Sequence, residues 1–185
     1  FNEEIVLSKK NKKKYSLKEF FLPFPRLDTR LGWGGEKNSR RAHHLAIVGD
    51  RVVVISGEGK TLYFKKNNIL NKQLDQIEIP NNIQSIINKN NFKLIGIRDL
   101  FEEDGKIYIS LIFKNSKGFS INAYRADLNF EKLNFELFFE TKEYWPSYNV
   151  YSGGRFSTYK DNKILFTIGY SNIKKAAQQL NSLLG

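Results

Sequence analysis

Residues 104–124 read DGKIYISLIFKNSKGFSINAY, and this stretch decides the fold of the chain. An Asp-Gly pair opens it, an apolar run from Ile107 to Phe113 follows, and a polar turn at 115–118 leads into a second apolar run, Phe119–Tyr124. Short Asp/Asn/Gly turns between apolar runs favour β-hairpins, because these residues tolerate positive φ angles. The stretch therefore predicts consecutive antiparallel strands.

The same design of an apolar strand, a tight polar turn and a second apolar strand occurs three times along the chain. The three pairs of runs are Leu45–Val48 with Arg51–Ile55, Leu94–Ile97 with Lys106–Leu111, and Arg155–Tyr159 with Lys163–Ile168. A basic residue opens each second run, and the intervals are 55 residues (51 to 106) and 57 residues (106 to 163). A steady period of this length is typical of propeller repeats.

The middle repeat has room for four strands. Its last strand alternates, so that Leu133, Phe135, Leu137 and Phe139 are expected to face one way. Four antiparallel strands make one propeller blade. We therefore expect an all-β fold in which residues 43–185 form a partial β-propeller, about three blades' worth of strands, with blades starting near 43, 94 and 154. A β-sandwich is the competing fold, but it does not predict the 55-residue register.

The two ends of the chain differ from this pattern. Residues 1–42 are predicted to be a leader that is first basic and then rich in Pro and Gly, and residues 171–185 carry the 3–4 spacing of a short helix. The run Lys9–Lys14 is interpreted as a solvated tail, with a polyanion-binding patch as the alternative. Nucleic acid is not expected as a partner, although the net charge is +11.

Composition excludes several kinds of chemistry. Hydrophobic residues make up 41% of the 185, which suffices for a packed core, and no run approaches the roughly 18–20 apolar residues of a membrane span. No signal peptide is visible in the given chain. The absence of cysteine excludes disulfides, thiolate metal sites and a Cys nucleophile.

Polar residues at two places could bind metal, but neither pattern favours it. His43 and His44 are neighbours on an expected strand, so they point to opposite faces and would not chelate one ion. Four carboxylates near the second hairpin could bind calcium, but they lack a regular calcium loop and are expected to form a solvated turn. They are Asp99, Glu102, Glu103 and Asp104. No metal site is predicted from these residues.

The segment 144–155, YWPSYNVYSGGR, is the densest candidate site. Aromatic rings with Asn and Arg suit a sugar or a planar cofactor, through ring stacking and guanidinium donors. The candidate binding residues are Trp145, Tyr148, Asn149 and Arg155. The alternative interpretation is a structural crossover in which the aromatic rings pack and Gly153-Gly154 relieves backbone crowding.

Three motifs at the end of the chain carry a family resemblance. NVYSGGRF (149–156), KILFTIG (163–169) and QQLNSLLG (178–185) together resemble the soluble glucose/sorbosone dehydrogenase family, in its N-terminal half only. The resemblance implies a six-bladed propeller for the complete protein, secreted or periplasmic, which binds pyrroloquinoline quinone and calcium and oxidises aldose sugars. Most calcium and quinone contacts in that family come from later blades.

Two positions depart from the family pattern. Tyr151 stands where the resemblance places the catalytic His base, and Thr167-Ile168-Gly169-Tyr170 replaces Thr-Gly-Asp. A tyrosine with an ordinary pKa near 10 is a poor base at neutral pH. The expected function is therefore part of a quinone-dependent sugar dehydrogenase that has lost activity. The alternative is a non-catalytic propeller that binds a glycan, a protein or another copy of itself.

Overall fold

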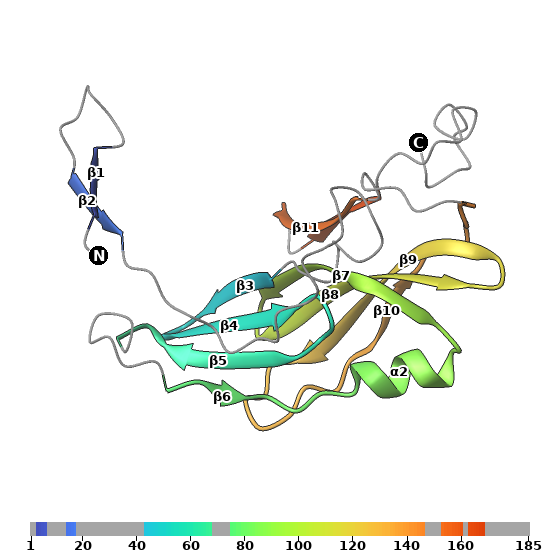
Figure 1. The fold of residues 1–185 in the computed structure, drawn as a ribbon, viewed down its shortest axis with the longest axis horizontal. Helices are drawn as coiled ribbons and strands as arrows, with labels where there is room; N and C mark the ends of the chain where they lie inside the picture. The colour runs from blue at the N-terminus through green and yellow to red at the C-terminus, as the bar shows by residue number, and fades with distance from the viewer. Residues whose placement is uncertain are drawn as a thin grey trace.

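The computed structural model describes residues 3–6, 14–17, 43–67, 75–146, 153–160 and 163–168. Within them the chain is an antiparallel β-protein with one short helix, so the all-β prediction is confirmed (Figure 1). Strands β1 (Glu3–Val6) and β2 (Lys14–Leu17) pair as a hairpin inside the segment predicted to be a leader. The expected C-terminal helix and positions 9–13 of the lysine run lie outside the described residues.

The first four-stranded sheet is an antiparallel meander. Its strands, in spatial order, are β3 (His43–Val48), β4 (Arg51–Ser56), β5 (Thr61–Lys65) and β6 (Ile77–Glu78). Gly49 at the β3–β4 turn has a φ of 56°, a conformation that glycine adopts at no steric cost. The predicted hairpin at the start of the repeat is therefore confirmed.

The second sheet repeats this order. Its strands are β7 (Lys93–Glu103), β8 (Lys106–Asn115), β9 (Gly118–Asp127) and β10 (Glu136–Glu140). Asp104 and Gly105 have φ angles of 51° and 70°, as a two-residue hairpin turn with primed geometry requires. Helix α2 (Ile83–Lys89) links the two sheets and was not predicted.

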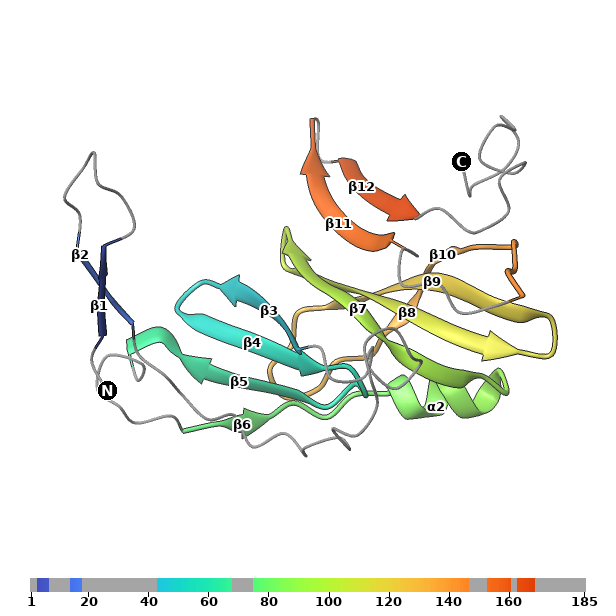
Figure 2. The ribbon, with the colours of Figure 1, turned by 45° about the horizontal axis from the view of Figure 1, so that its top comes forward.

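Apart from the β1–β2 pair, a further two-stranded sheet follows the two four-stranded ones and is called the third sheet below. It consists of β11 (Gly153–Tyr159) and β12 (Lys163–Ile168). Arg51, Lys106 and Lys163 open the second strand of the three sheets, as the repeat predicts. The first strands of the sheets, β3, β7 and β11, follow one another in space, because β7 contacts both of the others. Figure 2 shows β11 and β12 lying across the second sheet.

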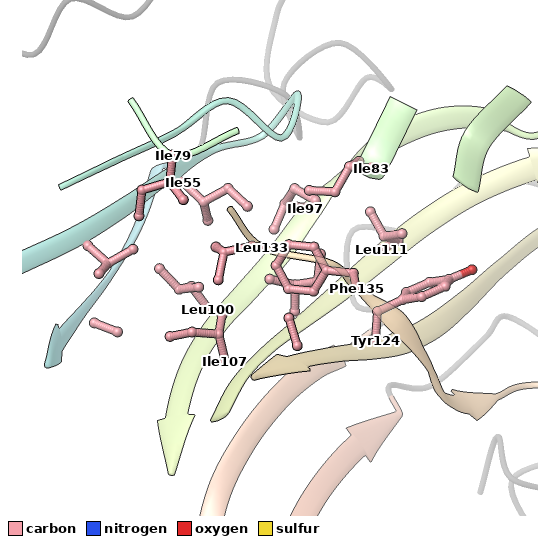
Figure 3. Packing of buried hydrophobic residues seen from close by; sticks show 14 of the residues in the cluster. Ile55, Ile79, Ile83, Ile97, Leu100, Ile107, Leu111, Tyr124, Leu133 and Phe135 are labelled. Carbon is pink, nitrogen blue, oxygen red and sulfur yellow. The ribbon is translucent and has the colours of Figure 1, made fainter. Parts of the chain in front are cut away.

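The core lies on both faces of the second sheet. Ile107, Ile109 and Leu111 on β8 pack towards the first sheet and α2, where they meet Ile55 and Ile83 in the largest buried cluster (Figure 3). The intervening β8 side chains pack on the opposite face, towards β11 and β12. A strand buried on both faces reads as a continuous apolar run, which explains the sequence of β8.

The last strand of the second sheet departs from its predicted alternation. Leu133 and Phe135 are buried as expected, but they precede β10, and Leu137 is 53% exposed. The register shifts between Leu137 and Phe139, which marks a β-bulge or irregularity. An extra residue reverses which side of the sheet the following side chains face, so the four apolar residues do not share one face.

The three sheets formed by β3 to β12 stack without closing into a ring, so a propeller is not established by these residues. Each of the first two sheets has the strand number and the order of a blade, and the third has two strands. No helix in the described part of the chain is long and apolar enough to cross a membrane.

Candidate functional site

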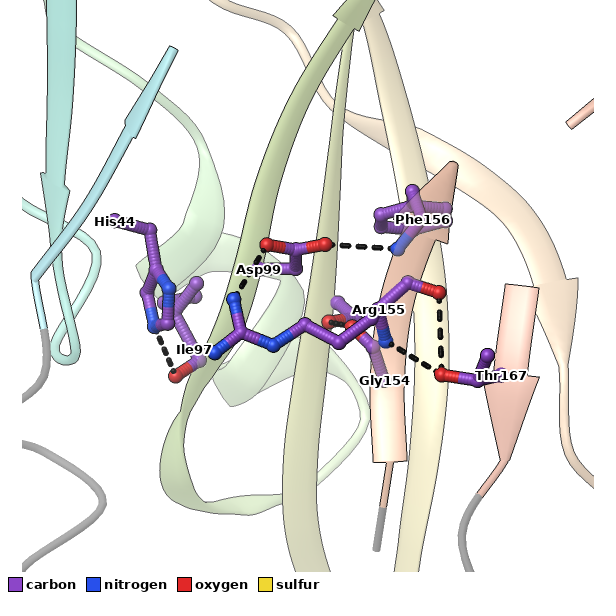
Figure 4. A network of polar contacts seen from close by, with 8 residues as sticks. His44, Ile97, Asp99, Gly154, Arg155, Phe156 and Thr167 are labelled. Atoms are coloured by element: carbon purple, nitrogen blue, oxygen red, sulfur yellow. Dashed lines mark hydrogen bonds and ion pairs between the residues drawn. The ribbon is translucent and has the colours of Figure 1, made fainter. Parts of the chain in front are cut away.

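The candidate site lies where the three first strands meet. His44 on β3, Asp99 on β7 and Arg155 on β11 come from sequence positions far apart, and Figure 4 shows their side chains directed towards one another. They are joined through hydrogen bonds to each other or to neighbouring backbone groups. The site is therefore a product of the sheet stacking and not of one loop.

A bulge in β7 decides where Asp99 points. Ile97 pairs with Leu111 and Asp99 pairs with Ser110, so Arg98 is an extra residue in the strand. Because side chains alternate along a strand, this insertion changes the phase between Ile97 and Asp99. Ile97 packs in the cluster shared with the first sheet, whereas Asp99 faces β11.

The Asp99 carboxylate is buried but satisfied. Its Oδ1 accepts a hydrogen bond from Arg155 Nη1 at 2.9 Å, and its Oδ2 accepts one from the backbone N–H of Phe156 at 2.8 Å. A buried carboxylate is costly unless it is paired and hydrogen-bonded, and here both oxygens have donors. Asp99 therefore fastens β11 to β7 and fixes one end of the Arg155 side chain.

One nitrogen of the Arg155 guanidinium is hydrogen-bonded to Asp99, and most of the side chain is exposed to solvent. Its side chain is 64% exposed, whereas that of Asp99 is 12% exposed. Its backbone N–H donates to Thr167 Oγ1 at 3.1 Å, and that hydroxyl donates to the Arg155 carbonyl at 3.3 Å, which ties β11 to β12. A guanidinium has five N–H donors in a planar fork that matches carboxylate and phosphate groups.

His44 is buried beside this pair. Its Nε2 lies 3.1 Å from the carbonyl oxygen of Ile97. Because a carbonyl only accepts, Nε2 carries the proton, and Nδ1 holds the lone pair in the neutral ring. Its neighbour His43 is exposed on the opposite face of β3, so the two rings do not converge, as the sequence predicts.

Burial is the main influence on the charge of His44. It lowers the pKa of His44 below the ordinary value of 6.5. The hydrogen bond to Ile97 opposes this shift. The Arg155 and Arg98 charges lower the pKa further, and the Asp99 charge raises it. The ring is therefore neutral at pH 7 and offers an acceptor next to a fixed cation.

Three of the four carboxylates considered for calcium have separate hydrogen-bond partners. Asp99 pairs with β11, Glu102 accepts the backbone N–H of Gly105 at 3.1 Å, and Glu103 accepts the Thr158 hydroxyl at 2.9 Å. Within the described residues no group of three or more His, Cys, Asp or Glu side chains could hold a metal ion. The hairpin carboxylates therefore form no calcium site, and the calcium that the family resemblance implies, which in that family is bound by later blades, stays a prediction.

The candidate residues of segment 144–155 do not all lie in one site among the described residues. Trp145 is 3% exposed and packs with Phe119 and Ile121, and its backbone pairs with that of Phe119 through two hydrogen bonds of 2.9 Å. Trp145 therefore has a structural place in the core. Tyr148, Asn149 and Tyr151 lie outside the described residues. Of the two candidates that the structure describes, Arg155 reaches the site built from the first strands and Trp145 does not.

Close packing explains the second glycine of the Gly-Gly pair. A side-chain carbon on Gly154 would lie 2.6 Å from Ile121 Cδ1 and 3.1 Å from Ser110 Oγ. That hydroxyl donates to the Gly154 carbonyl at 2.6 Å. The structural alternative for this segment, relief of backbone crowding, thus accounts for Gly154.

The sequence reasoning missed His44 and Asp99 as members of one site with Arg155. The sequence groups Asp99 with the hairpin carboxylates, and it places His43-His44 at the inner edge of a blade or on the surface without linking His44 to Arg155. Their positions on the first strands of successive repeats were the available signal. Comparison of the chain with protein-family models, with curated proteins and with solved structures finds no match.

Proposed function

We propose that the chain supplies blades of a β-propeller and that its first strands bind a carboxylate-bearing sugar, without catalysing its conversion. The four-stranded meanders, the repeat of 55 to 57 residues and the adjacent first strands support the propeller. In propellers the first strands surround the central channel. The secreted or periplasmic location that the family resemblance implies suits a glycan ligand.

The observation that carries the proposal is the Asp99–Arg155 pair. One guanidinium nitrogen is anchored at 2.9 Å on a buried carboxylate, while most of the side chain is exposed. Such a fork is oriented before ligand arrives, which reduces the entropy that binding costs. Its other donors suit a carboxylate, and the net charge of +11 attracts anions in general.

A comparison of glucuronate with glucose tests this proposal, because glucuronate has a carboxylate where glucose has a hydroxymethyl group. Arg155→Ala should weaken glucuronate binding about tenfold, the usual range for charge-assisted hydrogen bonds, whereas Arg155→Lys should retain part of it. Isothermal titration calorimetry measures both variants. Arg125→Ala, which removes an exposed guanidinium from β9, is the matched control for charge.

Arg155→Lys also keeps a cation beside Asp99, so it should preserve the fold. Weaker binding in this variant therefore reports the loss of guanidinium donors and not a loss of folding. Equal affinity of wild type and Arg155→Ala for glucuronate would exclude the site. Equal weakening by Arg125→Ala would show that only general charge attraction is involved.

A second candidate is the quinone-dependent sugar dehydrogenase, and His44 favours it. Its neutral ring lies beside Arg155, and its unprotonated nitrogen can accept a proton near neutral pH. Tyr151 has no such nitrogen and is a poor base at that pH. In this candidate His44 Nδ1 would take the proton of the sugar hydroxyl, and Arg155 would hold a carboxylate of the quinone cofactor. Pyrroloquinoline quinone, when bound, would supply the two-electron oxidant that accepts the hydride from the same sugar carbon.

Dye reduction with glucose, added pyrroloquinoline quinone and calcium tests the second candidate. Wild type should reduce the dye, and His44→Gln should lower the rate at least tenfold, as expected on removal of a general base. His43→Gln is the control on the same strand. Absence of turnover in wild type, together with glucuronate binding, would favour the non-catalytic proposal.

A further inference from the structure

A groove of about 390 Å³ lies on the face of the second sheet that carries helix α2. Helix α2 forms one wall and strands β9 and β10 form the other, and β8 and β9 separate β10 from β7 in the sheet. The volume falls within the roughly 300–1,000 Å³ of small-molecule sites. Apolar and polar side chains share its lining.

Phe92 gives the groove a flat apolar surface. Its ring is stacked on that of Phe113 with 3.8 Å between centroids and 19° between planes. Phe113 is 2% exposed, so it fixes the Phe92 ring from one side. Phe92 is partly exposed and lines the groove, as does Leu137 on β10. The groove therefore has an aromatic ring held in place before any ligand binds.

Polar groups surround this surface. Tyr124 lies in the groove, hydrogen-bonded to the side chain of Asn122, and Glu140 lies close enough to influence its charge. Burial raises the pKa of Tyr124 above its ordinary value of 10, so the hydroxyl keeps its proton at neutral pH. Asn122 is itself fixed, because its Oδ1 accepts the Thr141 backbone N–H at 3.1 Å. Lys89 completes the lining from α2.

A peptide strand is not the ligand that this groove favours. Strand β10 is the edge of its sheet, but its register shifts between Leu137 and Phe139. Such bulges disrupt the regular ladder that strand addition needs and protect edges from pairing. A compact ligand with one apolar face and several hydroxyl groups matches the groove better.

We propose that this groove binds a neutral pyranose sugar, with the C–H face of the ring on Phe92 and hydroxyl groups bonded to Tyr124 and Glu140. The negative face of an aromatic ring attracts the weakly positive C–H groups. A carboxylate accepts hydrogen bonds from two hydroxyls at once. The site differs from the Arg155 site in place and in ligand charge, so neither depends on the other.

Methyl β-D-glucopyranoside is the probe, because its hydroxyl groups are equatorial and both ring faces present C–H groups. A titration followed by ¹H–¹⁵N NMR should give saturable shifts at the amides of Phe92, Tyr124 and Leu137. Phe92→Leu retains apolar bulk but removes the ring, and it should weaken binding about fivefold. Glu140→Gln should weaken binding several-fold, because it retains one acceptor oxygen.

The controls separate this site from the other one. Glu136→Gln changes a carboxylate on the same strand that lines a different hollow, and it should bind as wild type does. Arg155→Ala should also bind the glucoside normally. Shifts that fail to saturate, shifts confined to the first strands, or unchanged affinity in both Phe92→Leu and Glu140→Gln would overturn the proposal. Glu140 is exposed, so its variant is expected to fold even if the Phe92 variant does not.

Discussion

At the scale of single residues, His44 makes stability depend on pH. Its folded-state pKa lies below 6.5, chiefly because of burial, whereas in the unfolded chain it titrates near 6.5. Below pH 6.5 the unfolded state therefore binds more protons, and the free energy of unfolding falls as pH decreases until the folded-state pKa is passed. The neutral ring thus contributes stability that is present above pH 6.5 and lost in weak acid.

Urea unfolding at about pH 7.5 and about pH 5.5 measures this effect. Wild type should lose stability over this interval, and His44→Gln should lose less, because the amide can still donate to the Ile97 carbonyl but does not titrate. His43→Gln, on the exposed face of β3, should retain the wild-type decline. Equal declines in wild type and His44→Gln would assign the pH dependence to other groups.

Single residues also show where the sequence was insufficient. Arg155 could be singled out because aromatic residues with Asn and Arg in one short segment suit the binding of a sugar or a planar cofactor. Its partner Asp99 could not be identified, because Asp99 lies 56 positions away and its direction depends on the bulge at Arg98. The signal that places Asp99 is three-dimensional, since a strand without that extra residue would turn its carboxylate away.

At the scale of elements, the hairpins were predictable because their determinants are local. Asp104-Gly105 adopts the positive φ angles that such a pair tolerates, and apolar runs on either side form β7 and β8. Strand β8 packs against an apolar cluster on each face, so its continuous apolar run indicates a strand buried on both sides. These features depend on neighbours in sequence, which explains why sequence reasoning found them.

Elements whose limits depend on tertiary packing were not predictable. Strand β6 has only two residues, and α2 has buried residues Ile83 and Ile87 that meet the large core. In the β10 region, Asn82 exchanges two hydrogen bonds with the Phe135 backbone, at 2.8 and 3.0 Å. These contacts hold the segment before β10 away from regular pairing, so the alternation seen in the sequence does not continue as one strand face.

At the scale of the whole molecule, hydrogen bonds, apolar packing and close backbone approach join the described sheets. The third sheet meets the second through hydrogen bonds at Asp99, Ser110 and Glu103, and through the packing of Phe156 on Tyr108. Repeat proteins gain stability from such interfaces between neighbouring units. A change confined to the interface between the second and third sheets should therefore loosen the third sheet before it affects the first.

Gly154→Ala tests that interface directly. The residue has a φ of 89°, and its added carbon would lie 2.6 Å from Ile121 Cδ1, a side chain that is fully buried. Overpacking and a strained backbone each cost about 1–3 kcal/mol, so we expect a loss of about 2 kcal/mol or more in the free energy of unfolding. Hydrogen exchange should increase in β11 and β12 while β3 to β5 remain protected.

Gly49→Ala is the control that separates the two causes. Gly49 also has a positive φ, 56°, but nothing lies within 4 Å of the carbon that the substitution adds. It should therefore lose only the about 1–2 kcal/mol of a left-handed alanine, and its effect should appear in the first sheet. If both variants lost equal stability, backbone strain alone would explain Gly154, and tight stacking of the sheets would not be its reason. A larger loss for Gly154→Ala, with increased exchange confined to β11 and β12, would show that close packing at Gly154 holds the third sheet against the second.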